Sequence, residues 1–208
     1  FYLNLAPNLD ATITPHHILD RGVVWESQLR HKTKWLGDGE LNYAYLNKDA
    51  TEQDERWLIN YQQAGRWTPN LQHRWVYNHV SDSDYLNDMN PSAAVDRTTH
   101  LPRRGEILFD QGSWHADATI ESFQTIDDDI TLANRPYRRL PQFNLNYKPQ
   151  TLNGLRFTQT LQTTRFNRDS EATINNIDQT LSGFSAINGD RLVSDSGAFY
   201  PMEWPFGY

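Results

Sequence analysis

The 208-residue sequence contains no cysteine, which excludes disulfide bridges, zinc–thiolate centres and cysteine nucleophiles. No apolar run approaches the roughly 18 residues of a membrane-spanning helix, so helical membrane proteins are also excluded. There is no Gly-x-Ser-x-Gly elbow, phosphate-binding loop or His-Glu-x-x-His motif. We therefore assign no catalytic residue, no metal ligand and no cofactor, and we expect that the protein is not an enzyme.

Aromatic residues, in contrast, are abundant in a strongly polar chain. They make up 12% of the residues and include seven tryptophans, while the mean hydropathy is -0.75. The net charge of -7 argues against a nucleic-acid partner, which selects for basic surfaces. A polar chain rich in Trp and Tyr is typical of a carbohydrate-binding β-domain or of an outer-membrane barrel with aromatic girdles.

Apolar and polar residues alternate with a period of two along most of the chain. The segment 9–14 reads Leu-Asp-Ala-Thr-Ile-Thr, and the segment 141–147 reads Pro-Gln-Phe-Asn-Leu-Asn-Tyr. This pattern predicts an all-β fold of about ten antiparallel strands, the tenth within 190–202. One polar and one apolar face also describe a soluble sandwich, so alternation alone leaves both architectures open.

The lengths of the links between predicted strands favour a transmembrane barrel. Counting from the strand at 9–14, the links after the fourth, sixth and eighth strands are short, whereas those after the third, fifth, seventh and ninth are long. A membrane barrel has short turns on one side and long loops on the other, which a sandwich has no reason to maintain. The tight turn at 20–22 falls on the long-loop side and does not fit. The long links are 47–55, 81–102, 125–140 and 165–189.

Three local features each permit two interpretations. Pro15 removes a ladder donor from an alternating strand, so it marks either a weak edge strand or the end of that strand. The acidic residues 127–129 suit a divalent cation or a solvated loop, but lack the glycine and distal glutamate of a calcium loop. The basic and aromatic segment 135–139 suits either anionic lipid headgroups or a solvated rim.

A series of motifs resembles the LptD family, the lipopolysaccharide-assembly proteins of the Gram-negative outer membrane. The block 2–15, Tyr-Leu-Asn-Leu-Ala-Pro-Asn-Leu-Asp-Ala-Thr-Ile-Thr-Pro, is similar to the family's first barrel segment and is the most specific match. The similarity runs in register from residue 1 to about 147, and more loosely to 208. The other matching motifs are Arg21-Gly22, Trp25-Glu26, Leu29-Arg30, Gly39-Glu40-Leu41, Tyr45-Leu46, Arg56-Trp57, Val80-Ser81-Asp82, Tyr85-Leu86-Asn87-Asp88 and Tyr137-Arg138-Arg139-Leu140-Pro141-Gln142.

This resemblance implies a barrel of about twenty-six antiparallel transmembrane strands. Residues 1–208 would form the N-terminal portion of the barrel domain, without the family's periplasmic jellyroll and later strands. The implied function is lipopolysaccharide transport into the outer leaflet of the cell outer membrane, through a lateral gate between the first and last strands. The implied partners are the plug lipoprotein LptE, an LptA-type periplasmic bridge and lipopolysaccharide itself.

The resemblance and the alternation together assign residues to three groups. Pro15 falls on the family's first-strand proline, which weakens the pairing that closes the barrel. The lateral-gate strand is predicted to contain Pro7, Asn8, Asp10, Thr12, Thr14 and Pro15. The lumen-facing candidates are Glu26, Arg30, Arg74 and Asp117, and the lipid-facing aromatics are Trp25, Trp57, Trp75 and Trp114.

Two other functions stay open on the sequence. One is a soluble β-sandwich that binds glycans through exposed Trp and Tyr side chains. The other is a small outer-membrane barrel enzyme, which requires an acid, a base and a nucleophile clustered at one rim. The transport hypothesis requires that the four tryptophans lie outside a closed, dry core.

Overall fold

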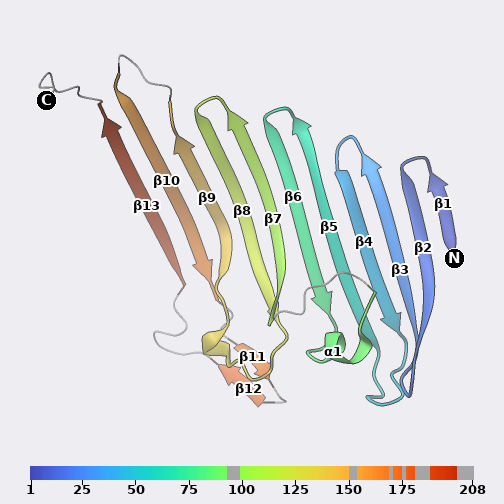
Figure 1. The fold of residues 1–208 in the computed structure, drawn as a ribbon. Helices are drawn as coiled ribbons and strands as arrows, with labels where there is room; N and C mark the ends of the chain where they lie inside the picture. The colour runs from blue at the N-terminus through green and yellow to red at the C-terminus, as the bar shows by residue number, and fades with distance from the viewer. Residues whose placement is uncertain (93–98, 150–153, 169–170, 175–176, 181–187, 201–208) are drawn as a thin grey trace, which may run out of the picture.

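Eleven antiparallel strands form one open sheet in which strands adjacent in the chain are adjacent in space (Figure 1). The computed structural model describes residues 1–92, 99–149, 154–168, 171–174, 177–180 and 188–200. No helix of this described part is long and apolar enough to cross a membrane. The all-β prediction is confirmed. The strands of the sheet are β1 Tyr2–Ala6, β2 Leu9–Ile18, β3 Gly22–Thr33, β4 Gly37–Leu46, β5 Arg56–Thr68, β6 Leu71–Val80, β7 His100–Gln111, β8 Trp114–Thr125, β9 Arg138–Tyr147, β10 Arg156–Asn167 and β13 Gly189–Phe199.

The predicted strands correspond to β2–β10 and β13, and the extra strand β1 was not predicted. It is five residues long and is separated from β2 by Pro7, so it lacks the length and continuity that the pattern needs. Residues 201–202, in which the tenth strand was allowed to end, lie outside the described residues. The long link 165–189 contains a separate two-stranded sheet of β11 (Glu171–Ile174) and β12 (Ile177–Thr180).

Short turns lie at one end of the sheet and long links at the other, as Figure 1 shows. The long links carry the helix α1 (Tyr85–Met89) and the 3-10 turn η1 (Leu132–Asn134). The β2–β3 turn also lies at the long-loop end, although it is short. Its Asp20 has a φ of 64°, the left-handed region that short polar side chains tolerate.

The strand register sorts the side chains of β2–β8 onto two faces, because directly paired residues of antiparallel strands point to the same side. We call one the aromatic face. It carries the odd-numbered residues of β2–β7 and the even-numbered residues of β8. The other, the polar face, carries the remaining residues. On the aromatic face, Trp25 and Trp114 are 50% and 46% exposed.

The buried core lies on the polar face at the long-loop end. The segment 81–92, which we call the strap, follows β6 and contains α1. Tyr85, Leu86 and Met89 of the strap belong to one apolar cluster with side chains of β3–β6. Burial in this sheet therefore comes from a link that folds back rather than from a second sheet. The polar-face strand residues in the cluster are Val24, Ala44, Leu46, Leu58 and Val80. Leu101 also belongs to the cluster, although it is odd-numbered, and it lies near the start of β7 beyond the β6–β7 register.

Candidate functional site

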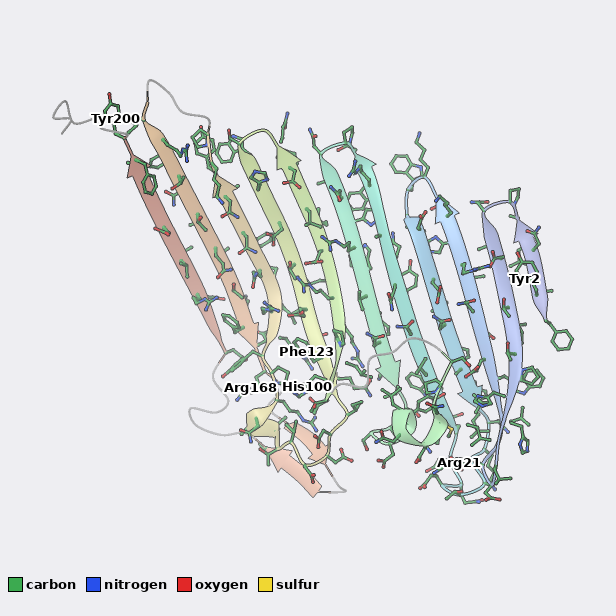
Figure 2. The ribbon with its side chains drawn as sticks, in the orientation of Figure 1. Tyr2, Arg21, His100, Phe123, Arg168 and Tyr200 are labelled. Carbon is green, nitrogen blue, oxygen red and sulfur yellow. The ribbon has the colours of Figure 1, made fainter. Side chains whose placement is uncertain are left out.

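The predicted gate residues lie in a hairpin at one edge of the sheet. Pro7 and Asn8 form the turn between β1 and β2, while Asp10, Thr12 and Thr14 lie on the polar face of β2. β2 is the second strand of the sheet, and β1 is the outermost (Figure 1). The predicted gate strand is thus one strand in from the edge. Figure 2 shows Tyr2 of β1 and Tyr200 near the end of β13 at opposite edges.

Pro15 removes a donor from the outer side of β2, not from its pairing with β3. The Ile13 amide donates to the Phe1 carbonyl at 2.8 Å, so residues 11, 13 and 15 direct their backbone groups toward the β1 side. On the other side, Pro15 stays in register with Trp25 of β3. The outer side of β2 near Pro15 therefore offers one ladder hydrogen bond fewer to any strand that approaches it.

Three of the four lumen-facing candidates make defined contacts on the polar face. Arg30 forms a bidentate pair with Asp10, with N–O distances of 2.8 and 3.0 Å, and so ties β3 to the predicted gate strand. Asp117 accepts a 2.7 Å hydrogen bond from the Asn144 amide. The fourth, Arg74, is exposed opposite Glu106 in the register. These four residues share one face of the sheet. That this face lines a lumen stays a prediction.

Glu26, the remaining candidate, joins the sheet to the strap. Its carboxylate accepts hydrogen bonds from the Ser92 amide at 3.1 Å and the Ser92 hydroxyl at 2.5 Å. The two residues enclose a cavity of about 140 Å³ that Thr12 and Thr14 of β2 also line. The tip of the strap therefore lies on the polar face directly beside the predicted gate strand.

The four predicted lipid-facing tryptophans share the aromatic face. Trp25 and Trp57 are linked through Tyr45, which is paired with both. Trp75 lies across Gly105 of β7, where an added Cβ would be 2.5 Å from its ring. Trp114 packs against the Tyr147 ring of β9 in a tilted arrangement, at a centroid distance of 4.4 Å. Among the described residues, no second layer turns this face into a closed core, and its contact with lipid stays a prediction.

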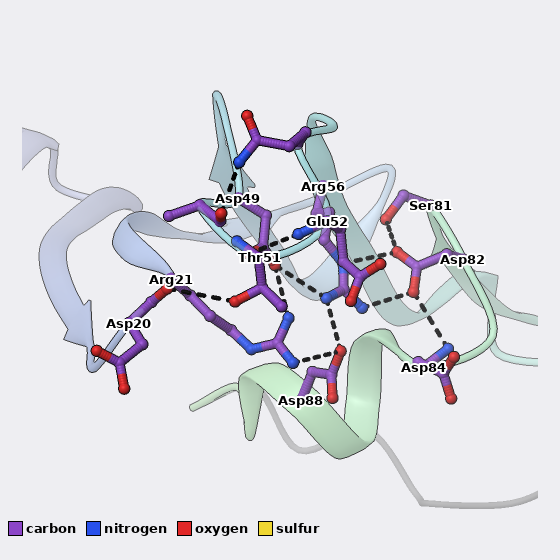
Figure 3. Close-up of polar contacts among 12 residues, drawn as sticks. Asp20, Arg21, Asp49, Thr51, Glu52, Arg56, Ser81, Asp82, Asp84 and Asp88 are labelled. Carbon is purple, nitrogen blue, oxygen red and sulfur yellow. Dashed lines mark hydrogen bonds and ion pairs between the residues drawn. The ribbon is translucent and has the colours of Figure 1, made fainter.

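A network of buried charges holds the long-loop end together (Figure 3). Arg56, 3% exposed at the start of β5, donates to Asp49 at 3.1 Å, to Asp88 at 2.7 Å and to Asp82 at 2.6 and 2.9 Å. Arg21 in the β2–β3 turn binds Asp49 at 2.8 Å and Asp88 at 3.0 Å. Two arginines thus connect one turn, one long link and the strap to the sheet.

Asp49 is the centre of this network, and its side chain is fully buried. Burial alone would raise the pKa of Asp49. Hydrogen bonds from the Arg21 guanidinium, the Thr51 amide and Arg56 more than offset burial and lower that pKa to about 2. The carboxylate is therefore ionised at neutral pH, as a partner of two buried or half-buried cations must be.

A ladder of asparagines crosses the polar face beneath the strap. The Asn42 amide donates to Asn60 at 3.1 Å, Asn60 donates to Asn78 at 2.7 Å, and Asn78 donates to the Pro102 carbonyl at 3.1 Å. All three asparagines are at most 8% exposed. Each amide completes the hydrogen bonding of the next, which makes burial of a polar row tolerable.

The sequence did not predict the charge network or the asparagine ladder. Arg56, Asp82 and Asp88 all lie in motifs that carry the family resemblance. Their separations of 26 and 32 residues, however, gave no reason to pair them. The useful signal was positional: Arg56 begins a strand, and both aspartates follow the next strand, so an antiparallel hairpin returns them to the same end.

The acidic residues 127–129 make hydrogen bonds within their own loop and to the start of the strap. Asp127 accepts from the Asp129 amide at 3.0 Å, and Asp128 accepts from the Ser83 hydroxyl at 2.7 Å. Over the described ranges, no three His, Asp or Glu side chains converge in a way that could hold a metal ion. The hydrogen bond between Asp128 and Ser83 links this loop to the start of the strap.

The chain is similar to known proteins of one family. Residues 54–208 match the family model LptD, LPS transport system D. An LPS-assembly protein LptD of Pseudomonas syringae pv. syringae is 34% identical over the whole chain, which covers 24% of that relative. One from Acinetobacter baumannii is 35% identical over the whole chain and 25% of the relative, and one from Alcanivorax borkumensis is 39% identical over 71% of the chain and 19% of the relative.

The chain therefore spans about a quarter of the length of the curated relatives it matches. The matched family region covers β5 to β13 and so includes most of the sheet. The relatives extend the similarity across β1–β4 and the Pro15 region. An open all-β sheet is the architecture expected of one portion of a larger outer-membrane barrel. The chain belongs to the LptD family of LPS transport proteins.

Proposed function

We propose that the protein transports lipopolysaccharide to the outer leaflet of the Gram-negative outer membrane, and that this chain forms the barrel wall beside a lateral exit. The observation that carries the proposal is the family match across a two-faced open sheet. The relatives it resembles are named LPS-assembly proteins. A polar face suits a water-filled lumen, and an exposed aromatic face suits lipid and its interfaces.

The edge formed by β1 and β2 is the proposed side of the exit. An exit for a bulky lipid needs a pair of strands that separate at little cost. Pro15 supplies such a weakness, because it removes a donor from the outer side of β2 while the β2–β3 ladder stays complete. The tight β2–β3 turn leaves the long-loop end of this edge unobstructed.

The proposed partners follow from the family. An LptE-type plug would occupy the lumen on the polar face, and an LptA-type bridge would deliver lipopolysaccharide through a jellyroll domain. The strap narrows the space on the polar face beside β2, so the plug and the strap would together define the passage. No step of this proposed transport makes or breaks a covalent bond.

Transport is tested with the full-length protein in cells whose own copy can be shut off. Newly made, pulse-labelled lipopolysaccharide should stop reaching the cell surface after shut-off and should resume when the plasmid copy is induced. A photo-crosslinking residue at Thr14, on the polar face of β2, should capture lipopolysaccharide. The same crosslinker at Ala116, close to the short turns on the aromatic face of β8, is the matched control and should capture none. Continued surface delivery after shut-off would refute the proposal.

The gate is tested separately by Pro15→Ala, which restores the missing donor. One added ladder hydrogen bond stabilises the closed edge by about 1 kcal/mol, so surface delivery should slow. Pro69→Ala, in the β5–β6 turn, is the control and should leave delivery unchanged. If both variants deliver lipopolysaccharide at the original rate, the gate assignment is wrong and the transport proposal still stands.

A further inference from the structure

Arg103 is the single formally charged residue on the aromatic face of β2–β8. Every other Asp, Glu, Lys and Arg whose register is given in these strands belongs to the polar face. On the aromatic face, Arg103 is paired with Tyr77 of β6 and Ser122 of β8. A lone charge on a lipid-directed surface is costly, and such residues are retained where they have a task.

The Arg103 side chain is held in a fixed position and keeps unused donors. Its Nε donates to the Asn78 carbonyl at 3.1 Å, and one terminal nitrogen donates to the Gln124 side chain at 3.2 Å. The guanidinium lies over the Tyr77 ring, 5.3 Å from its centroid. A guanidinium has five N–H donors, and these two bonds are its hydrogen bonds within the described part of the chain. Within the described ranges, no carboxylate forms an ion pair with Arg103.

Arg103 borders a hollow of about 620 Å³ on this face. Gly105, two residues along β7, makes the hollow possible. A Cβ there would lie 2.5 Å from the Trp75 ring, so only glycine lets that ring lie flat against the sheet. The aromatic and aliphatic side chains around the hollow include Tyr61, Trp67, Trp75, Tyr77 and Ile120.

A second arginine lies at the same level of the sheet. Ser122 is paired with Arg103, and Glu121 with Arg139, so Arg138 falls opposite Ser122 on the aromatic side. Arg103 and Arg138 are thus one strand apart across β8, near the long-loop end of β7 and β9. Figure 2 shows His100, where β7 begins, at that end. The aromatic hollow runs from Arg103 toward Leu36 and Trp67 near the short turns.

We propose that this hollow is a binding site for the lipid A portion of lipopolysaccharide on the outer wall of the barrel, with a phosphate on Arg103 and an acyl chain against Trp75. The proposal rests on the proposed function for its orientation, which puts the long-loop end at the outer leaflet. Lipid A carries two phosphates on a compact sugar pair, and two neighbouring arginines match that charge. Arginine is suited to this contact because its planar fork binds phosphate in a bidentate manner.

The test uses the full-length protein purified from outer membranes in mild detergent. Delipidated protein is incubated with purified bis-phosphorylated lipid A, and native mass spectrometry measures the bound fraction. Arg103→Gln should weaken binding about ten-fold or more, since charge-assisted hydrogen bonds to phosphate are lost. The matched control is Arg66→Gln, the same change on the polar face of β5. Arg66 is exposed and is not among the residues that line the hollow, so lipid A binding should be unchanged.

The wild-type protein supplies a test that needs no variant. Lipid A stripped of both phosphates, or phosphatidylglycerol, should bind at least ten-fold more weakly than the bis-phosphorylated form. Equal binding of any of these lipids, or equal binding by Arg103→Gln protein, would overturn the proposal. Surface delivery of labelled lipopolysaccharide is measured in cells that depend on the Arg103→Gln protein. Normal delivery by a variant that has lost lipid A binding would leave the transport function standing and assign Arg103 to lipid retention alone.

Discussion

Two regions of the sheet, strands β3–β6 and the edge strand β13, differ sharply in burial. Strands β3–β6 carry a buried cluster, an asparagine ladder and a charge network, all covered by the strap. In β13, at the opposite edge, every residue except Gly197 is exposed. The strands are similar in length, at 10 to 13 residues, so length does not explain the difference.

The difference comes from what the long links do. The link after β4 and the strap after β6 fold back over the polar face, where Arg21 and Arg56 bind their aspartates. This gives one region of an open sheet a core of its own. The lesson is that a barrel wall has two sources of stability: the ladder shared by all strands, and local caps built by loops. Substitutions that affect only the ladder or only a cap should distinguish the two contributions to stability.

The largest effect is expected from Arg56→Met. It leaves Asp49, Asp82 and Asp88 without their shared cation, and removing one partner from a buried ion network costs about 3–5 kcal/mol. Hydrogen exchange of the full-length protein should speed up in 47–55 and 81–92, with β10 and β13 unchanged. Arg74→Met, at an exposed position, is the control and should change neither. Unchanged protection of the strap in the Arg56 variant would contradict a role for the network as its clamp.

The second prediction concerns the apolar core and compares the same Val→Ala substitution at two positions. Val80 is 1% exposed and Val193 is 42% exposed. Val80 lies on the polar face, and the pairing of Val193 with Gln162 of β10, and of Gln162 with Asn144 of β9, places Val193 on the same face as Asp117. Val80→Ala should cost about 2 kcal/mol through lost burial and a small cavity. Val193→Ala should cost less than about 0.5 kcal/mol. Urea unfolding of the full-length barrel in detergent measures both. Equal losses would mean that β13 is as well packed as β6.

The alternation of residues was sufficient to predict most of this architecture. A period of two predicted antiparallel strands, and the parity of link lengths predicted which end of the sheet carries the loops. The two-faced distribution of Trp25 and Glu26 also follows from alternation, since neighbours in a strand point to opposite sides. β1 escaped detection because a five-residue strand bounded by Pro7 is too short to show a pattern.

The contacts of the polar face could not be predicted in the same way. Glu26 and Ser92 are 66 residues apart, and their contact depends on where the strap folds, which no local pattern encodes. Asp49 lies in a link that reads as an ordinary polar loop, although its side chain is fully buried. Sequence periodicity reports which face a strand residue occupies. It does not report which link will cover that face.

A pH effect of intermediate size is expected from Asp49. Its pKa is lowered from 3.8 in the unfolded chain to about 2 in the folded protein. The stabilisation, on the order of 2 kcal/mol, is therefore complete above 3.8 and is lost as the pH falls through the folded value. Pepsin cleavage within 47–55 and 81–92 should increase as the pH is lowered between these values. Asp49→Asn should already be cleaved faster at the upper pH and should show a flatter pH profile. A wild-type profile identical to that of the variant would contradict the assignment.

The smallest effect concerns the tip of the strap, where the capped region meets the proposed gate edge. Glu26→Gln removes the charge that receives the Ser92 amide and hydroxyl, at a cost of about 1 kcal/mol. Hydrogen exchange at the Ser92 amide should increase several-fold, while α1, held by Asp88, should keep its protection. Glu40→Gln is the control, because Glu40 bonds Asn42 on the same face and has no contact with Ser92. If the tip loosens alone, the strap has a fixed base at the charge network and a separable tip beside β2. If α1 loosens with it, the strap is a single rigid cap, and any opening beside the gate edge must displace the whole of it.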